Sequence, residues 1–368
     1  MSLHIQNMVI KLGVSTITNG NKRLCRQSMF DLAQQIAKIH KNGQRIIIVT
    51  TGAIAAGREI IETPRQERYQ PSKQILAAVG QTRIMHIWSE LFSFFDILVG
   101  QLLITRHEFS NRTSYLNLRD SLTSLLNQNI IPIINENDPV VSKVHRVGDN
   151  DHLSALIANM VGSHLLVLLT DQKGLYNDDP ARNPNAELIP IVAQINDTIL
   201  NYADGTTGLN TGSMLTKLQA AQFAVQNGIP TVIASSKSPD ILLHLASGQR
   251  EGTLFLAETT PRESRKRWLL AETPVGILKI DQSTEEQLRK QAASLTTAGI
   301  VEIGNTFDRG SIVQIQTLNN QPIAVGLTNY TSKDLLRLLS SQNKRIEDCL
   351  GYTFGQEVIH RDHLVLLN

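Results

Sequence analysis

Short, almost continuously apolar runs alternate with stretches of helical spacing over the first 257 residues. The first two runs, residues 8–12 and 45–50, are too short to cross a membrane and too apolar for a solvated edge. Buried parallel strands have this pattern. Further runs lie at 97–104, 130–134, 164–170, 229–235 and 253–257, and helical spacing occurs at 28–41, 73–95, 115–127 and 214–227. The alternation predicts a parallel sheet with helices on both faces.

The pattern changes after Ala257. Residues 258–273 are charged and irregular, and we expect them to form a linker. Beyond them, β-like runs at 276–280, 300–303, 311–315, 323–327 and 358–359 are interrupted by one helical stretch at 333–340. The sequence therefore predicts an α/β domain over 1–257 and a small β-barrel-like domain over 274–368.

Composition narrows the class of protein. The formal net charge of the 368 residues is +2, which favours no polyanion as a partner. Cys25 and Cys349 lie far apart and form no metal-ligand spacing, and we predict no metal site made by the protein. No apolar stretch approaches the ~18 residues of a membrane span, and the N-terminus has no signal-like segment. We expect a cytoplasmic protein without a membrane partner.

The first candidate functional residues lie where the first two predicted strands end, because ligands of open α/β sheets bind at the carboxyl ends of the strands. A lysine in a buried strand, Lys11, is costly unless an anion meets it, although it can also extend to solvent. Gly52 and Gly57 lie among small residues after the second strand. They allow either close approach of a ligand or close strand–helix packing.

Polar clusters follow the later strands. Asn135 to Asp138 directly follow a buried run; they form either an ordinary turn or a site in which Asp138 pairs with an ammonium group. Asp149, Asn150 and Asp151 precede an apolar helix, which needs only one of them as its cap. The remaining carboxylates can orient lysines or approach a metal-bound nucleotide.

Two more segments point to a nucleotide. Thr170 and Asp171 end the strand at 164–170, at the ligand edge of the sheet. The loop at 208–217 is glycine-containing and leads into a helix, but it does not have the spacing of a P-loop. Lys217 can reach a phosphate from the first helical turns, or it can be an ordinary surface lysine.

Together and in this order, these segments are similar to the glutamate 5-kinase family, in which an amino-acid kinase domain is followed by a PUA domain. The resemblance covers essentially the whole chain. The most specific stretches are 9–13, 51–57, 74–81, 134–138, 148–151, 169–176, 298–300 and 307–310. It implies a three-layer α/β/α domain with a mainly parallel central sheet, plus a small β-barrel-like PUA domain.

The resemblance also implies roles for individual residues. Lys11 and Lys217 would contact the transferring phosphoryl group, with Asp149 and Asp151 organising the lysines and substrate. Glutamate would be bound by Thr51, Gly52, Asn135, Asp138 and Asn150. The nucleotide would be bound by Lys11, Thr170, Asp171, Thr211, Gly212, Ser213, Met214, Leu215, Thr216 and Lys217.

Four positions depart from the family pattern. Thr51 stands where the family commonly has serine, which keeps a hydroxyl but is tighter sterically. Asn210 and Ser213 replace glycine, and Leu215 replaces serine, in the nucleotide loop. These three departures bear on the flexibility of the loop and on nucleotide affinity.

The implied reaction moves the γ-phosphoryl of ATP, carried with Mg²⁺, onto the side-chain carboxylate of L-glutamate, the first step of proline biosynthesis. A carboxylate of pKa about 4.3 is already ionised at neutral pH, so no general base is needed. We expect two lysines, from opposite sides of the sheet, to neutralise the repulsion between the two anions. The resemblance further implies feedback inhibition by L-proline and a homo-oligomer, either a dimer or a tetramer.

Three alternatives compete with this interpretation. A related kinase can act on acetylglutamate, aspartate, carbamate or a nucleotide, but the cluster at 135–138 with Asn150 favours an unmodified amino acid. PUA domains resemble RNA-binding modules, yet residues 274–368 contain no dense basic stripe, so we do not expect RNA as a partner. A nicotinamide dehydrogenase is disfavoured by the glycine spacing.

Overall fold

The computed structural model describes residues 5–61, 72–140, 149–204, 214–291, 293–341 and 345–367. The chain divides into two compact units. The first comprises Met1–Asn111 and Ser121–Thr260, and the second comprises Arg112–Asp120 and Pro261–Asn368. The predicted domain boundaries at 257 and 274 remain predictions.

A central sheet of eight strands organises the described part of the first unit, in the order β3-β4-β2-β1-β5-β7-β8-β6. Its strands are β1 (Asn7–Leu12), β2 (Arg45–Val49), β3 (Val99–Ile104), β4 (Ile131–Glu136), β5 (Leu165–Thr170), β6 (Ile191–Val192), β7 (Thr231–Ser235) and β8 (Thr253–Phe255). Among the strand pairs that the structure describes in this sheet, only β7–β8 is antiparallel. The mainly parallel sheet is therefore confirmed, and the central β1 has β2 and β5 as neighbours.

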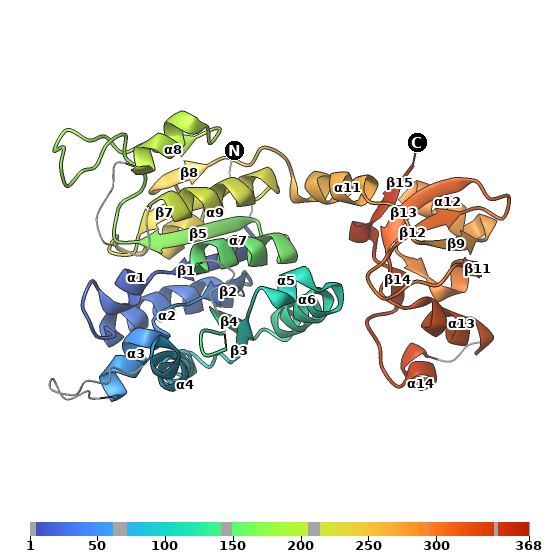
Figure 1. Cartoon of the computed structure of the whole chain (residues 1–368), viewed down its shortest axis with the longest axis horizontal. Coiled ribbons are helices and arrows are strands. Elements are labelled where there is room, and N and C mark those ends of the chain that lie inside the picture. The colour runs from blue at the N-terminus through green and yellow to red at the C-terminus, as the bar shows by residue number, and fades with distance from the viewer. Residues whose placement is uncertain are drawn as a thin grey trace. The chain divides into compact units, whose positions relative to one another are not determined.

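Helices cover both faces of this sheet (Figure 1). They are α1 (Val14–Thr18), α2 (Arg26–Lys41), α3 (Ala53–Ile60), α4 (Lys73–Ser93), α5 (His107–Ser110), α6 (Arg112–Asn127), α7 (Asn150–Val161), α8 (Asp197–Asp204), α9 (Met214–Gln226) and α10 (Ile241–Ala246). Met8, Ile10 and Leu12 share a buried core with α2, α4 and α10. Helices α7 and α9 pack on each other, α7 against β1 and β5 and α9 against β7. The result is the predicted three-layer α/β/α architecture.

Helices α3 and α4 approach unusually closely at two glycines. A Cβ on Gly80 would lie 1.7 Å from the carbonyl oxygen of Ala53, and one on Gly57 would lie 2.0 Å from that of Leu76. Glycine inside a helix costs roughly 1 kcal/mol relative to alanine. The close contact that only glycine permits brings α4 toward the carboxyl ends of β2 and β4.

The second unit is built around a five-stranded sheet in the order β11-β9-β12-β13-β15, with a separate pair β10-β14. Its elements are α11 (Pro261–Ala271), β9 (Gly276–Ile280), α12 (Gln282–Gln291), β10 (Leu295–Thr296), β11 (Ile300–Gly304), β12 (Ile312–Gln316), β13 (Pro322–Leu327), α13 (Ser332–Ser340), α14 (Ile346–Leu350), β14 (Glu357–Ile359) and β15 (Leu364–Leu366). Leu278, Val313, Ile315 and Tyr330 lie at the centre of its core. The small β-rich domain is thus present.

Helix α11 shows where the expectation of an irregular segment at 258–273 is wrong. Pro261 occupies the first helical position, where its fixed φ suits a helix and its missing N–H costs nothing. Only Leu269 is fully buried among the residues of this helix. A helix with so little apolar surface carries no hydrophobic period, so its sequence does not indicate it.

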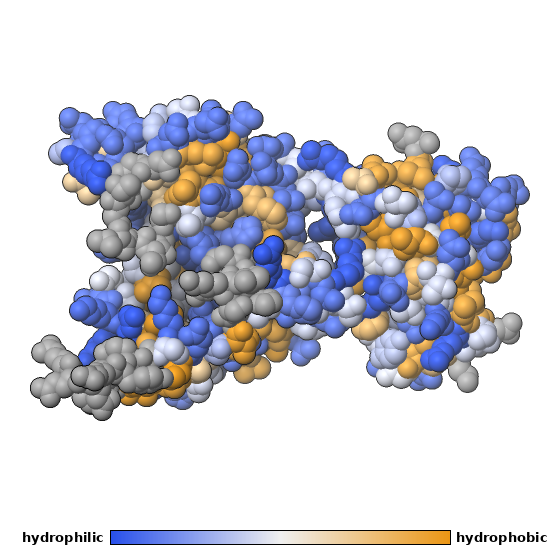
Figure 2. Space-filling model, in the orientation of Figure 1, coloured by the Kyte–Doolittle hydropathy of each residue, from blue (hydrophilic) through white to orange (hydrophobic). Residues whose placement is uncertain are grey.

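The visible surface is mixed in character. Figure 2 shows hydrophilic residues interspersed with hydrophobic areas on both units. Within the described ranges, no helix is both long enough and apolar enough for a membrane crossing.

Candidate active site

The site lies at one edge of the central sheet, where the parallel strands β1, β2, β4 and β5 all end. Lys11 is near the end of β1, and Thr50 and Thr51 follow β2. Asn135 is the last residue but one of β4, and Thr170 ends β5. Because parallel strands present their carboxyl ends together, residues as far apart in sequence as Lys11 and Thr170 meet at this edge.

A buried carboxylate joins two buried lysines there. Lys11 Nζ lies 2.5 Å from Asp151 Oδ1, and Lys217 Nζ lies 3.2 Å from Asp151 Oδ2. The three side chains are at most 7% exposed. The hydroxyl of Thr216 also donates to Asp151 Oδ2, at 3.1 Å. The predicted lysines therefore converge from β1 and α9 on one residue of α7.

Both lysines lie on the same face of the sheet, so the expectation that they approach from opposite sides is wrong. Side chains alternate along a strand, and Ile10 and Leu12 face the core with α2 and α4. Lys11 consequently faces α7, which carries Asp151, and α9, which carries Lys217. The sequence showed the alternation but not which helices cover each face.

Burial and charge act in opposition on these groups. Burial lowers the pKa of Lys11, and nearby Lys217 lowers it further, against the attraction of Asp151. Burial would raise the pKa of Asp151, but the two lysines hold that pKa below its usual value. Asp151 is therefore ionised at neutral pH, although it lies almost entirely out of water.

Asp149 has the structural role that the sequence left open among three residues. It is the N-cap of α7, and its side chain accepts a hydrogen bond from the backbone N–H of His152 at 2.9 Å. Its negative charge also acts on Lys11 to raise the pKa of that lysine. The cap thus leaves Asn150 and Asp151 free for other contacts.

Asn150 belongs to a network of side-chain amides beside the lysines. Its Nδ2 donates to the carbonyl of Thr50 at 2.8 Å and to Asn135 Oδ1 at 2.9 Å. Asn135 Nδ2 in turn donates to Gln81 Oε1 at 2.8 Å. Asn135 and Gln81 are both buried, at 2% and 6% exposure. Two predicted substrate residues are therefore held in one network.

The other predicted substrate residues, Thr51, Gly52 and Asp138, follow the carboxyl ends of β2 and β4. The hydroxyl of Thr51 donates to the carbonyl of Leu12 at 3.1 Å, which links the ends of β2 and β1. Gly52 begins α3 with φ of 91°, and a Cβ there would lie 2.2 Å from Ile17 Cδ1. Only glycine therefore fits at position 52 without strain. Asp138 lies just after β4 and is half-buried.

The predicted nucleotide residues are described in part. Thr170 is buried, and its hydroxyl donates to Asp171 Oδ1 at 3.0 Å, at the end of β5. Met214, Leu215, Thr216 and Lys217 form the first turn of α9. Thr211, Gly212, Ser213 and the departure at Asn210 lie outside the described residues.

Gln81 is the site residue that sequence reasoning missed, although residues 74–81 marked a family stretch. It occupies the buried stripe of α4 between Gly80 and Ile84. A polar residue in an apolar stripe needs a buried hydrogen-bond partner. The polar Gln81 among apolar positions of α4 was therefore a sequence signal for a buried hydrogen bond. Only the fold identifies its partner, Asn135.

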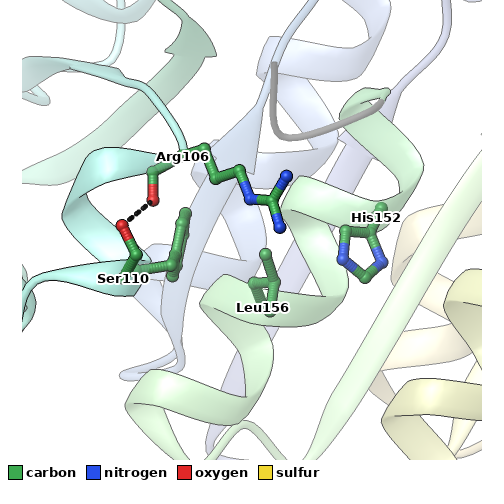
Figure 3. A pocket seen from close by; sticks show the side chains of 5 residues that line it. Arg106, Ser110, His152 and Leu156 are labelled. Atoms are coloured by element: carbon green, nitrogen blue, oxygen red, sulfur yellow. Dashed lines mark hydrogen bonds between the residues drawn. The ribbon is translucent and has the colours of Figure 1, made fainter. Parts of the chain in front are cut away.

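A separate pocket of about 450 Å³ lies beside α7 (Figure 3). Arg106, Phe109, Ser110, His152 and Leu156 line it, and the Ser110 hydroxyl donates to the carbonyl of Arg106 at 3.2 Å. Figure 3 shows the Arg106 guanidinium extending toward α7. None of these residues is among the predicted site residues. His152 lies one residue beyond Asp151, hence about 100° around the helix from it.

The chain is similar in sequence to two known domain families and to known enzymes. The profile of the Amino acid kinase family matches residues 7–235, and that of the PUA domain matches residues 276–350. A glutamate 5-kinase of Haemophilus influenzae (strain PittEE) is 44% identical over 365 residues, 99% of each chain. One of Shigella flexneri is 45% identical over 361 residues, 98% of each chain. The chain therefore belongs to the amino acid kinase family and, within it, to the glutamate 5-kinases with a C-terminal PUA domain.

Proposed function

We propose that the chain transfers the γ-phosphoryl group of ATP to the side-chain carboxylate of L-glutamate. The products are γ-glutamyl phosphate and ADP, and the reaction opens proline biosynthesis. The observation that carries the proposal is the pair of buried lysines on one carboxylate, at the ligand edge of the sheet. The relatives named glutamate 5-kinase support the choice of substrate.

Repulsion between two anions is the main obstacle to this reaction. The acceptor carboxylate is ionised at neutral pH, so it attacks without a general base. Lys11 and Lys217 supply two positive charges, which neutralise charge on the transferring group. This is catalysis by position and electrostatics. Asp149 and Asp151 hold the two ammonium groups in place.

Nucleotide binding is assigned to the end of β5 and to the start of α9. Thr170 and Asp171, together with residues 211–217, would hold ATP, and Lys11 and Lys217 would contact its phosphates. Within the described part of the chain, no cluster of three or more His, Cys, Asp or Glu side chains could hold a metal. Mg²⁺ characteristically keeps water and phosphate ligands, and we expect it to arrive as MgATP.

Glutamate binding is assigned to Thr51, Gly52, Asn135, Asp138 and Asn150. Asp138 supplies a carboxylate for the α-ammonium group, and the backbone at Gly52 permits close approach of the ligand. Acetylglutamate has no ammonium group, and aspartate has a shorter side chain. An unmodified glutamate therefore matches these residues better than either alternative.

Regulation and assembly are further parts of the proposal. We expect feedback inhibition by L-proline and a dimeric or tetrameric assembly, as the resemblance to the glutamate 5-kinases implies, and a cytoplasmic location. RNA is not an expected partner of the PUA domain here.

A coupled assay of ADP release tests the function directly. With Mg²⁺ and ATP present, glutamate should support turnover, whereas acetylglutamate, aspartate, carbamate and UMP should give only a small fraction of that rate. Added proline should lower the glutamate-dependent rate. Preference for any other acceptor in this panel would overturn the proposal.

A further inference from the structure

Gln81 is a buried amide whose position depends on the close contact between α3 and α4. Gly80 precedes it, and the approach of Gly80 to Ala53 lets α4 come near β4. Gln81 Oε1 thereby accepts a hydrogen bond from Asn135 Nδ2 at 2.8 Å. Gln81 Nε2 is buried and has no partner among the described residues.

Backbone groups fix the direction of every amide in this network. The N–H of Glu136 can only donate, and it donates at 2.9 Å to Asn135 Oδ1. The carbonyl of Thr50 can only accept, and it accepts at 2.8 Å from Asn150 Nδ2. Asn135 must therefore turn its Nδ2 toward Gln81, which must present an oxygen.

The same logic decides which atom of Asn150 remains available. Its Nδ2 carries two hydrogens, and both are used, by Thr50 and by Asn135 Oδ1. Asn150 Oδ1 has no donor among the described residues. It is an acceptor at the ligand edge of the sheet, which suits a ligand that brings N–H donors.

The unpartnered Nε2 of Gln81 needs an explanation, because a buried donor without an acceptor is destabilising. An apolar residue of similar size would remove that donor. It would also leave Asn135 Nδ2 buried without an acceptor, so that the Asn135 side chain would be held only through its oxygen, by Glu136 N–H and Asn150 Nδ2. The oxygen of Gln81 thus has a function that an apolar residue cannot supply.

We propose that Gln81 is a positioning residue that acts through Asn135 to hold Asn150 with its oxygen toward the α-ammonium group of the amino acid. The relay Gln81–Asn135–Asn150 favours an ammonium group, which has three N–H donors and a positive charge, over an N-acylated amino group, which has one N–H and no charge. This inference rests on the proposed function, because the ammonium group belongs to the proposed substrate.

Gln81→Met is the direct test, with Gln44→Met as its matched control. Gln44 also donates from a side-chain amide, to the carbonyls of Ile5 and Ala246 at 2.6 and 3.2 Å, but it precedes β2 at the opposite end of that strand. We expect Gln81→Met to raise KM for glutamate about tenfold, with kcat and KM for MgATP within about threefold of wild type. The preference for glutamate over N-acetylglutamate in kcat/KM should fall by a similar factor. Gln44→Met should leave these constants unchanged.

Gln81→Glu provides the rescue, because its carboxyl group presents an oxygen to Asn135 in either protonation state. Its KM for glutamate should stay within about threefold of wild type. An unchanged KM in Gln81→Met, an equal rise in Gln44→Met, or a tenfold rise in Gln81→Glu would overturn the relay. If Gln81→Met does not fold, Gln81→Leu, which also presents no oxygen to Asn135, takes its place in the same comparison. Wild-type protein that fails to use glutamate would instead overturn the proposed function.

Discussion

Asp151 is the residue on which the charge balance of the site depends. It is the buried carboxylate between two buried ammonium groups, and the half-buried Asp149 also acts on Lys11. Burying these charges is costly in the empty protein. It becomes favourable when the phosphates of ATP arrive, which explains why such an arrangement occurs at a ligand edge.

Replacing Asp151 with asparagine should therefore destabilise the protein strongly. Asp151→Asn leaves Lys11 and Lys217 uncompensated, and we expect the free energy of unfolding to fall by about 3 kcal/mol or more. Asp149→Asn is the matched control: asparagine is as good an N-cap as aspartate, and only the weaker attraction of the half-buried Asp149 to Lys11 is lost, so its effect should stay at about 1 kcal/mol, roughly a third of that of Asp151→Asn. Urea denaturation measures both. Equal effects would contradict the central position of Asp151.

The pKa of Lys11 predicts a pH dependence of activity. Because burial lowers that pKa below 10.5, Lys11 loses its charge at lower pH than an exposed lysine does. As pH rises through this lowered pKa, kcat/KM for MgATP should fall, with the midpoint below 10.5. Lys11→Arg, which stays charged, should show no such decline if it retains activity. A profile flat to pH 10.5 would refute the assignment.

At the scale of elements, the strands were predicted well and the short helices poorly. The runs at 8–12, 45–50 and 164–170 became β1, β2 and β5 with ends shifted by at most one residue. Their continuous apolar character marks them because they are buried on both faces. Helices α1, α5 and α10 have six residues or fewer, and so few turns give no readable period.

The α3–α4 contact makes a prediction at this scale. Alanine favours helix by roughly 1 kcal/mol over glycine, yet Gly80→Ala would force α4 away from Ala53. We expect net destabilisation of about 1–3 kcal/mol. KM for glutamate should also rise, because Gln81 moves with the helix. Gln74→Ala, on the exposed side of α4, should change stability by less than about 0.5 kcal/mol. Unchanged stability in Gly80→Ala would contradict the close packing.

At the scale of the whole molecule, the two-domain plan followed from the change of pattern near residue 257. The sequence did not indicate that Arg112–Asp120, at the start of α6, belongs to the second compact unit. Nor did it identify Gln81, whose role depends on a contact between residues 54 positions apart. The end of a strand can be predicted from a short run of neighbouring residues. A contact such as Gln81–Asn135 forms only when elements distant in sequence pack together.

Leu116 tests the composition of the second unit. It is fully buried and packs in a cluster with Leu269, Val325 and Val365. Leu116→Ala should lower the free energy of unfolding by about 2–5 kcal/mol, through lost apolar burial and a cavity. Leu336→Ala is the matched control; Leu336 is 57% exposed, and its loss should change stability by less than about 0.5 kcal/mol. Similar small effects for both would place Leu116 outside the core.

The central claim is that Lys11 and Lys217 together neutralise the transferring phosphoryl group. The most direct measurement is kcat for glutamate and MgATP in Lys11→Met and Lys217→Met, with folding checked by thermal denaturation. We predict that each substitution lowers kcat by at least ~100-fold, the scale of losing one transition-state donor. Turnover close to wild type in both folded variants would contradict the account.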